Sequence, residues 1–431
     1  MASSMVAPDL VAISRDLNIS SKLEGALTLS IFVAAYALGP LFWGPLSELY
    51  GRVVILQTSN LAFAVFNLAC GFAPSEGNLV AFRFLSGMAG SAPLAVGAGV
   101  LGDLFEPEER GRASSVYTLM PLLGPAVGPI LGGWVEEKSS WHWVFFSTTI
   151  ACGLIQVFGL LVLRETYAPV VLRRKASRLR RETGNLDLRT GDDDQGHSIV
   201  QKLRIALTRP FRLLVTQPIL QLLSFYMLYL YGLVYLVLST FAALWSNKYN
   251  ESTGIQGLNY ISLGLGFFLG AQACAPIQDR VYAAMKRRYV PDGEAGQPEF
   301  RVPMMVPGAL LVPVGLLIYS WTAEARVHWI APNIGATIYG AGTIISFLCL
   351  QTYVVDAYGQ YAASAIAAIT VLRSLAGFGF PLFAPIMYDR LGYGKGGTIL
   401  AGCAVVIGWP SPVILWLYGR RLRAGSKVTV R

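Results

Sequence analysis

Eleven long apolar runs, each near the length that crosses a lipid bilayer, dominate this 431-residue sequence. A membrane-spanning helix needs roughly 20 mostly apolar residues. In lipid the backbone must satisfy its own hydrogen bonds, so repeated runs of this kind predict a bundle of helices. We therefore expect an all-α membrane protein. The runs cover about 25–45, 53–73, 78–103, 113–135, 143–163, 218–244, 258–278, 302–321, 329–354, 362–386 and 396–418.

Composition agrees, because 54% of the residues are hydrophobic and only 14% are charged. Soluble domains carry nearer ~25% charged residues. The net charge of +9 could suggest a nucleic-acid partner, but Lys and Arg gather in the connections between apolar runs, which is the topology signal of a membrane protein. The five cysteines lie in apolar runs and suggest reduced packing residues. No spacing suggests a metal, a cofactor or an enzyme's catalytic group.

A polar break separates five runs from six. The short apolar stretch at 1–13 resembles the last turns of a further helix, which makes the pattern six plus six. A repeated six-span unit is typical of transporters that bind substrate between the repeats. We expect the linker to be largely disordered. The predicted parts are an N-terminal lobe at 1–163, a cytoplasmic linker at 164–217, a C-terminal lobe at 218–419 and a basic cytoplasmic tail at 420–431.

The charge distribution predicts the orientation. Placing the linker in the cytoplasm puts most of the 34 Lys and Arg residues on the inside. Both Asn-x-Ser/Thr sequons, at Asn18 and Asn250, then fall outside, where glycosylation can occur. Chance is the alternative explanation for that agreement.

The short connection after the first full run carries Glu48 and Arg52, four residues apart. These residues suggest a salt bridge that holds one conformation closed. Asp103 and Arg112 at the ends of neighbouring runs could join it, and Asp356 holds the corresponding position to Asp103 in the second half. Ordinary loop charge is the alternative, since an exposed pair contributes only ~0–1 kcal/mol.

Two arginines lie inside apolar runs. Arg83 and Arg373 each interrupt a predicted span. An intramembrane arginine costs roughly 2.5–3.5 kcal/mol on insertion scales and usually faces a cavity or a partner. A functional role is our hypothesis for both, and snorkelling to the membrane surface is the alternative.

Glycine recurs every fourth residue in the fifth span. Gly124, Gly128 and Gly132 share one helix face, which lets a neighbouring helix approach closely. Pro125 and Pro129 weaken the hydrogen-bond ladder and permit bending. The stretch is therefore interpreted as tight packing, a hinge between halves, or both.

Polar and aromatic side chains in the second half could line a cavity for aromatic or amphipathic solutes. An interfacial or packing role is equally open for each of them. These candidates are Gln221, Phe225, Tyr229, Gln272 and Gln351.

Several of these motifs together resemble a known family. Residues 44–52 resemble the loop signature between spans two and three of the major facilitator superfamily, and residues 83–87 resemble its span-four motif. Residues 124–133 resemble the span-five motif of proton-driven antiporters. Glu48 to Arg52, with residues 165–167, resembles the fungal twelve-span drug:proton antiporter branch.

This resemblance implies a monomeric exporter of drugs, fungal toxins or secondary metabolites in the plasma membrane or the vacuolar membrane. It implies alternating access driven by the proton gradient, with no cofactor. Glu48, Arg52 and Asp103 correspond to the family's cytoplasmic charge cluster, and Arg83 corresponds to its proton-coupling arginine. The family acid is usually Asp where this chain has Glu48. Most of span one is absent, and no carboxylate is expected at mid-membrane.

Other functions stay open at this point. An importer of a small polar nutrient could use the same fold. A truncated or inactive remnant would also fit the missing part of span one, and a non-transporting receptor or scaffold is a third class.

Overall fold

The computed structural model describes residues 2–19, 21–104, 117, 124–125, 127–185, 199–289 and 296–424. Within these residues the regular structure is helical and contains no strand. The helices are α1 (Leu10–Asp16), α2 (Lys22–Tyr50), α3 (Arg52–Gly71), α4 (Glu76–Gly90), α5 (Ala92–Leu104), α7 (Trp141–Val162), α8 (Ala168–Thr183), α9 (Ile199–Thr216), α10 (Pro218–Tyr249), α11 (Thr253–Tyr289), η1 (Pro298–Met304), α12 (Met305–Glu324), α13 (Ile330–Tyr358), η2 (Gly359–Tyr361), α14 (Ala362–Gly408) and α15 (Pro410–Ala424).

Nine helical stretches in the described part of the chain are long and apolar enough to cross a membrane. The last of them, Ala362–Arg423, contains two predicted runs, because Gly392 has a φ of 74° and divides α14 into two arms. The predicted run at 78–103 appears as α4 and α5 together. The run at 113–135 lies largely outside the described residues. The expected all-α membrane fold is confirmed.

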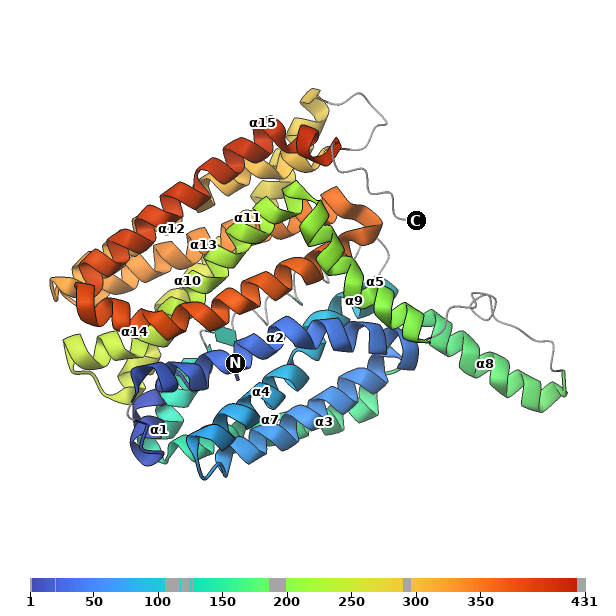
Figure 1. The fold of residues 1–431 in the computed structure, drawn as a ribbon, viewed down its shortest axis with the longest axis horizontal. Coiled ribbons are helices and arrows are strands. Elements are labelled where there is room, and N and C mark those ends of the chain that lie inside the picture. The colour runs from blue at the N-terminus through green and yellow to red at the C-terminus, as the bar shows by residue number, and fades with distance from the viewer. Residues whose placement is uncertain are drawn as a thin grey trace.

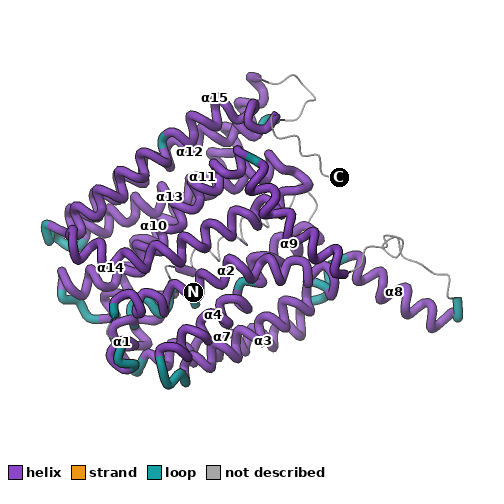
Figure 2. Tube along the Cα trace, viewed as in Figure 1, coloured by secondary structure: helices purple, strands orange, loops and turns teal. Residues whose placement is uncertain are grey.

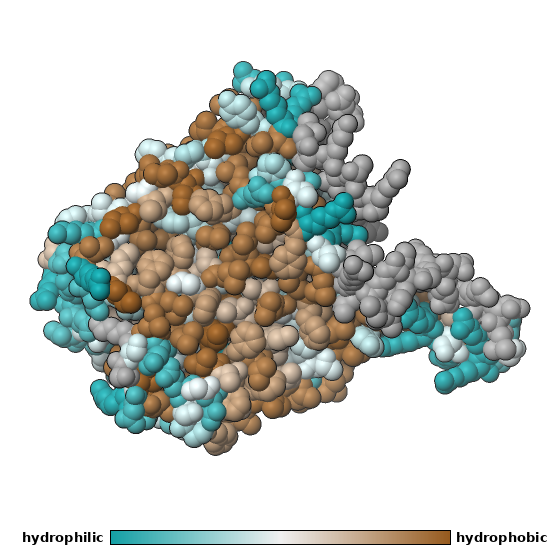
Figure 3. Space-filling model, in the orientation of Figure 1, coloured by the Kyte–Doolittle hydropathy of each residue, from teal (hydrophilic) through white to brown (hydrophobic). Residues whose placement is uncertain are grey.

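The long helices form two bundles that lie side by side (Figure 1). One contains α2, α3, α4 and α7, and the other contains α10 to α14. Helices α2 and α14 lie against each other along the seam between the bundles. The described loops lie at the helix ends (Figure 2), and apolar residues cover the middle of the visible face between two polar ends (Figure 3). This arrangement fits a protein whose middle is surrounded by lipid.

Specific residues set the helix boundaries. The Ser21 hydroxyl accepts a hydrogen bond from the Leu23 amide at 3.3 Å at the start of α2. Gly51, with a φ of 108°, ends α2 and lets α3 begin at the next residue. Asn250, in the left-handed region, ends α10.

The predicted disorder of the linker is wrong for two segments. Helix α8 ends at Gly184, with a φ of 68°, and projects away from the bundles (Figure 1). Helix α9 packs against α2 and α14 at the seam. An amphipathic sequence can form a helix despite its charge when one face finds a partner, which explains α9. Residues 186–198 lie outside the described part.

Aromatic side chains fill the core of the C-terminal bundle. The Phe241 ring stacks on Tyr319 with ring centroids 5.8 Å apart, and it packs against Trp245 and Tyr260. These rings are almost fully buried. All five cysteines are free, and four of them are buried.

The reversal at Gly392 yields a prediction. A Cβ there would lie 3.0 Å from the Glu324 carboxylate, which also accepts a hydrogen bond from the Tyr393 amide at 2.7 Å. Left-handed backbone costs a residue with a Cβ about 1–2 kcal/mol. We expect Gly392→Ala to lower the midpoint of thermal unfolding in detergent. Gly402→Ala, in open space on the same helix, is the control and should leave the midpoint unchanged or higher.

Candidate functional site

A cluster around Arg52 braces one end of the N-terminal bundle. The Arg52 Nε donates to Asp103 Oδ2 at 3.2 Å, and its Nη1 donates to the Ser47 hydroxyl at 2.7 Å. The guanidinium lies 4.8 Å from the Tyr167 ring centroid. Gly99 leaves room for it, because a Cβ there would lie 2.7 Å from the guanidinium carbon. Only 9% of the Arg52 side chain is exposed, so this pair is better shielded than a surface salt bridge.

Glu165, and not Glu48, supplies the second acid of this cluster. The Glu165 carboxylate accepts hydrogen bonds from the Arg52 amide at 2.9 Å and the Val53 amide at 3.3 Å. These amides open α3 and have no partner within the helix. The dipole of α3 also stabilises a negative charge at this position, next to the start of the helix. The end of α7 is thereby tied to the start of α3.

The predicted Glu48–Arg52 salt bridge does not form. Glu48 is exposed and makes no ion pair within the described part of the chain. Four-residue spacing brings side chains together only on a continuous helix, and Gly51 interrupts the helix between them. Arg112, the other predicted member, lies outside the described residues.

A second cluster occupies the same end of the C-terminal bundle. The Arg301 guanidinium bridges two acids, with Nε 2.9 Å from Asp356 Oδ2 and Nη1 2.9 Å from Asp279 Oδ1. It also lies 4.4 Å from the Tyr282 ring centroid. Asp356 was predicted as a gating residue from its correspondence to Asp103. Arg301 was missed, because the sequence alone makes it one more basic residue in a loop.

A buried carboxylate ties α15 to the same bundle. Glu299 accepts hydrogen bonds from Arg423 Nη2 at 2.7 Å and 2.5 Å, one to each carboxylate oxygen. The Tyr353 hydroxyl donates to Glu299 at 3.3 Å. Only 7% of the Glu299 side chain is exposed. Such charge-assisted pairs are the stronger class of hydrogen bond, so this contact fixes the C-terminal helix.

Arg83 lies fully buried inside the N-terminal bundle. Its Nε donates to the Thr28 carbonyl at 3.3 Å, and its Nη1 donates to the Ala2 carbonyl at 3.0 Å. The guanidinium stands 4.6 Å from the Phe32 ring centroid and 5.9 Å from that of Phe145. Its Nη2 has no hydrogen-bond partner. Arg83 is therefore buried and does not snorkel to the surface.

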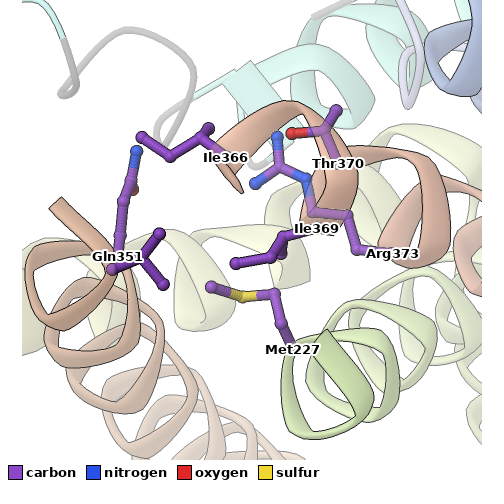
Figure 4. Close-up of a pocket in the computed structure, with 7 residues that line it drawn as sticks. Met227, Gln351, Ile366, Ile369, Thr370 and Arg373 are labelled. Carbon is purple, nitrogen blue, oxygen red and sulfur yellow. The ribbon is translucent and has the colours of Figure 1, made fainter. Parts of the chain in front are cut away.

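Arg373 lies in the C-terminal bundle beside a small cavity (Figure 4). Its guanidinium lies between the rings of Tyr231 and Phe347, 5.0 Å and 5.3 Å from their centroids. Its Nε is buried and has no hydrogen-bond partner. Gln351 and Thr370 supply the other polar groups of the cavity lining.

Of the five predicted cavity residues, the structure brings only Gln351 to this cavity. Tyr229 is buried, and its hydroxyl donates to the Leu400 carbonyl at 2.5 Å. Gln221 is exposed and donates to the Val215 carbonyl at 2.9 Å. The remaining two, Phe225 and Gln272, are exposed. Isolated polar or aromatic residues in a span do not reveal which face they occupy.

In the described residues 127–138, the glycine-rich span packs against both bundles. Gly132 lies against the Met5 carbonyl, and Gly133 lies against the Thr253 carbonyl of α11. The Pro129 carbonyl oxygen lies close to Gly257 of α11. A Cβ on Gly257 would lie 2.8 Å from this oxygen. Small residues allow this backbone approach. Elsewhere in the span, the Ser4 hydroxyl donates to the Gly124 carbonyl at 3.5 Å, Pro125 is half-buried and Gly128 is buried.

Glu137 completes the contact between the bundles at this end. Its carboxylate accepts a hydrogen bond from the Gly254 amide and one from the Ser252 hydroxyl at 3.3 Å. The first turn of α11, in the C-terminal bundle, is therefore capped by an acid from the other bundle. We call these contacts of residues 127–138 with α11 the outer seam, after the side to which the charge distribution assigns it.

Asp9, just before α1, is a buried acid that sequence reasoning missed. It is 1% exposed, and neither carboxylate oxygen has a hydrogen-bond partner. Its electrostatic neighbours are Glu136, which precedes the capping acid, and Tyr260 of α11. Asp9 lies near the end of the bundles that holds the outer seam, so the expectation that no carboxylate lies at mid-membrane stays a prediction. The signal was an acid directly after Pro8 in an apolar stretch.

Both sequons lie in connections at the end that holds the outer seam. Asn18 follows α1 and Asn250 ends α10, with φ values of 55° and 54°. Both asparagines are exposed. Use of either site for glycosylation stays a prediction.

Comparison with known proteins gives consistent matches. The family model described as Major Facilitator Superfamily matches residues 1–381. The chain is 48% identical to efflux pump vrtL of Penicillium aethiopicum over 99% of this chain and 84% of the relative. It is 42% identical to the probable efflux pump mfs2 of Aspergillus flavus over 97% and 98% of the two chains.

Solved structures share the fold. A bacterial homologue of the human lysosomal transporter Spinster, in an inward-facing conformation, matches with a TM-score of 0.66 at 14% identity, over 98% and 94% of the two chains. A D-xylose-proton symporter matches with a TM-score of 0.65 at 14% identity, over 96% and 93%.

The Arg52 cluster yields a prediction that separates the two acids. Glu165→Gln removes the carboxylate that accepts from two opening amides of α3, and loss of an N-terminal cap costs about 0.5–2 kcal/mol. We expect a lower midpoint of thermal unfolding in detergent. Glu48→Gln is the matched control and should change stability by no more than about 0.5 kcal/mol. Equal effects of the two substitutions would contradict the assignment.

Proposed function

We propose that this chain, which belongs to the major facilitator superfamily, exports small organic molecules in exchange for protons. Members of this family are multi-pass secondary transporters of small molecules and not enzymes, and this chain is one of them. Export is supported by the relatives, two of which are named as efflux pumps. The shared fold leaves direction open, because one solved neighbour is named as a D-xylose-proton symporter. Import of a small nutrient is therefore the alternative. We place the protein in the plasma membrane as a monomer, with the vacuolar membrane as the second candidate.

The charge clusters support movement of the two bundles as rigid bodies. The Arg52 cluster joins only α2, α3, α5 and the end of α7. The Arg301 cluster joins only α11, η1 and α13. Among the described residues neither cluster crosses between the bundles, so each can persist while the bundles rotate. Alternating access in such transporters is largely rocking of one repeat against the other.

The outer seam supplies the contact that such rocking would break. It consists of backbone approach at Gly133 and Gly257 and of the Glu137 cap on α11. Small-residue contacts separate without leaving bulky side chains caught between helices. A cap can also exchange its amide partners for water. We propose that this seam opens when the substrate site faces outward.

Asp9 is the observation that supports proton exchange. Its carboxyl is buried without a hydrogen-bond donor, and the nearby carboxylate of Glu136 opposes a negative charge on it. An ionised carboxylate in such a place is costly, so the protonated form is favoured while the seam is closed. Opening the seam would hydrate Asp9 and let it exchange its proton with the outer medium.

Because Asp9 is protonated when the outer seam is closed and can ionise when it is open, proton uptake is coupled to closure of the seam. A hydrated, ionised Asp9 must lose its water to be buried, and binding a proton removes that cost. External acid would therefore favour closure of the outer seam. The proton enters with the closed seam, which is the direction required of an antiporter that exports its substrate.

Export can be tested in a host that lacks its own efflux pumps. Cells that express the protein should retain less of a lipophilic fluorescent dye than cells with an empty vector. A protonophore should abolish the difference, because it removes the proton gradient. A panel should include a neutral, a cationic and an anionic dye, with uptake followed in parallel. Equal retention of every dye, or net uptake, would reject the exporter.

The role of Asp9 has its own test in proteoliposomes. Asp9→Asn keeps the shape and is permanently neutral, so we expect substrate exchange at equilibrium to continue while transport driven by a pH gradient falls at least about tenfold. Glu76→Gln, a half-buried acid at the same end, is the control and should behave as the wild type. Gradient-driven transport that survives in Asp9→Asn would exclude Asp9 as the proton site.

A further inference from the structure

We propose that the cavity beside Arg373 in the C-terminal bundle is part of a site for an anionic aromatic substrate, whose carboxylate or phenolate pairs with Arg373; this inference rests on the proposed export function. Arg373 comes from α14, and its guanidinium is directed along the cavity with Gln351 and Thr370 (Figure 4). Met227 and Ile369 supply apolar walls. A cation beside amide and hydroxyl groups in an otherwise apolar lining suits a ligand that is apolar with one charged end.

No described carboxylate serves as a counter-ion for Arg373. In the described part of the chain, no carboxylate lies within ion-pair distance of it and no group accepts a hydrogen bond from its guanidinium. Its only contacts of this kind are with the faces of the Tyr231 and Phe347 rings. Cation–π contacts offset part of the lost hydration. They leave every N–H of the guanidinium edge available to an acceptor.

Arg373 differs from other arginines of the chain in its partners. Arg52 and Arg301, at the ends of the bundles, are each paired with carboxylates. An arginine inside a membrane usually pairs with another side chain or with backbone carbonyls, as Arg83 does with the carbonyls of Thr28 and Ala2. We therefore infer that a bound ligand supplies the anionic partner of Arg373.

The surroundings place Arg373 at the boundary between the bundles. One turn along α14, Gly377 lies against Val33 of α2 and the Tyr231 ring. The Tyr231 and Tyr235 rings have centroids 5.1 Å apart, and the Tyr235 hydroxyl donates to Ser3 at 3.3 Å. Separation of α2 from α14 would therefore open the face that holds Arg373 and these rings.

A second unpaired cation approaches the same aromatic group from the other bundle. Tyr36 of α2 has both Tyr231 and Arg83 as electrostatic neighbours. Arg83 in turn has Tyr36 and Tyr235 as neighbours, and one of its terminal nitrogens is free. Two guanidinium groups thus flank one set of tyrosines without a described carboxylate between them. An anion near these tyrosines would be attracted by both guanidinium groups.

The cavity itself measures only about 10 Å³ in this conformation, which holds no more than one water molecule. A larger ligand can enter only after the bundles separate. Once inside, a carboxylate can take two parallel hydrogen bonds from the guanidinium, while its ring packs on the tyrosines. An uncharged analogue loses the charge-assisted bonds and leaves the arginine unpaired.

The test compares 2-naphthoate with 2-naphthamide, two probes of the same shape that differ in charge at pH 7.5. Binding to the purified full-length chain is measured from the concentration dependence of the thermal shift. We expect the wild type to prefer the acid at least about tenfold. Arg373→Gln should reduce the ratio of the two affinities by about 10- to 100-fold. Arg373→Lys should keep part of the preference, and Arg280→Gln, an exposed arginine on α11, should keep all of it.

The ratio is measured within one sample, so partial misfolding of a variant does not imitate the expected result. A structural arginine would lower stability and leave the ratio unchanged, which would overturn the inference. Equal binding of the two probes, or binding of neither, would also overturn it. Efflux of neutral or cationic dyes without preference for the acid would support the export function and reject the anion site. Preference for the acid without gradient-driven movement in proteoliposomes would support the site and reject the export function.

Discussion

An ion in a membrane interior is tolerated only where another group replaces its lost water, and this constraint sorts the charged residues of the chain. At the ends of the bundles, Arg52, Arg301 and Glu299 each meet an opposite charge at hydrogen-bond distance. Deeper in the bundles, Arg83 and Arg373 meet aromatic rings and no carboxylate. The paired charges stabilise the ends of the bundles, Arg83 donates to the Thr28 and Ala2 carbonyls, and Arg373 is proposed to bind a ligand. Stability and binding are thus assigned to different layers of the same fold.

The contacts within the bundles and between them differ in how many ion pairs the described residues supply. Within a bundle, ion pairs and helix caps fix the helix ends. Between the bundles, the described contacts include the Glu137 cap on α11 and small residues, such as Gly133 against Thr253 and Gly377 against Val33. Contacts of this type rely on close backbone packing, which is lost over a short displacement. The proposed alternating access requires that the bundles stay intact while these contacts between them separate.

The sequence predicted the features that depend on local properties. Length and hydropathy identified the spans, and Arg83 was recognised because a charge inside an apolar run is conspicuous. Features that depend on the fold could not be predicted in this way. Glu165 lies 113 residues from Arg52 along the chain and meets it only after folding. Glu48 was chosen by helical spacing, and Gly51 breaks the helix that would have made this spacing meaningful.

The two proposed sites have an electrical consequence when they operate together. A proton that enters through Asp9 and a monoanion that leaves past Arg373 move charge across the membrane in the same electrical sense. Each elementary charge that crosses is worth about 2.3 kcal/mol per 100 mV. With a negative interior, the membrane potential would then drive both halves of the exchange, in addition to the pH gradient. A neutral substrate would gain this assistance only from the proton. Selection of an anion at the seam would therefore strengthen export without any further coupling device in the protein.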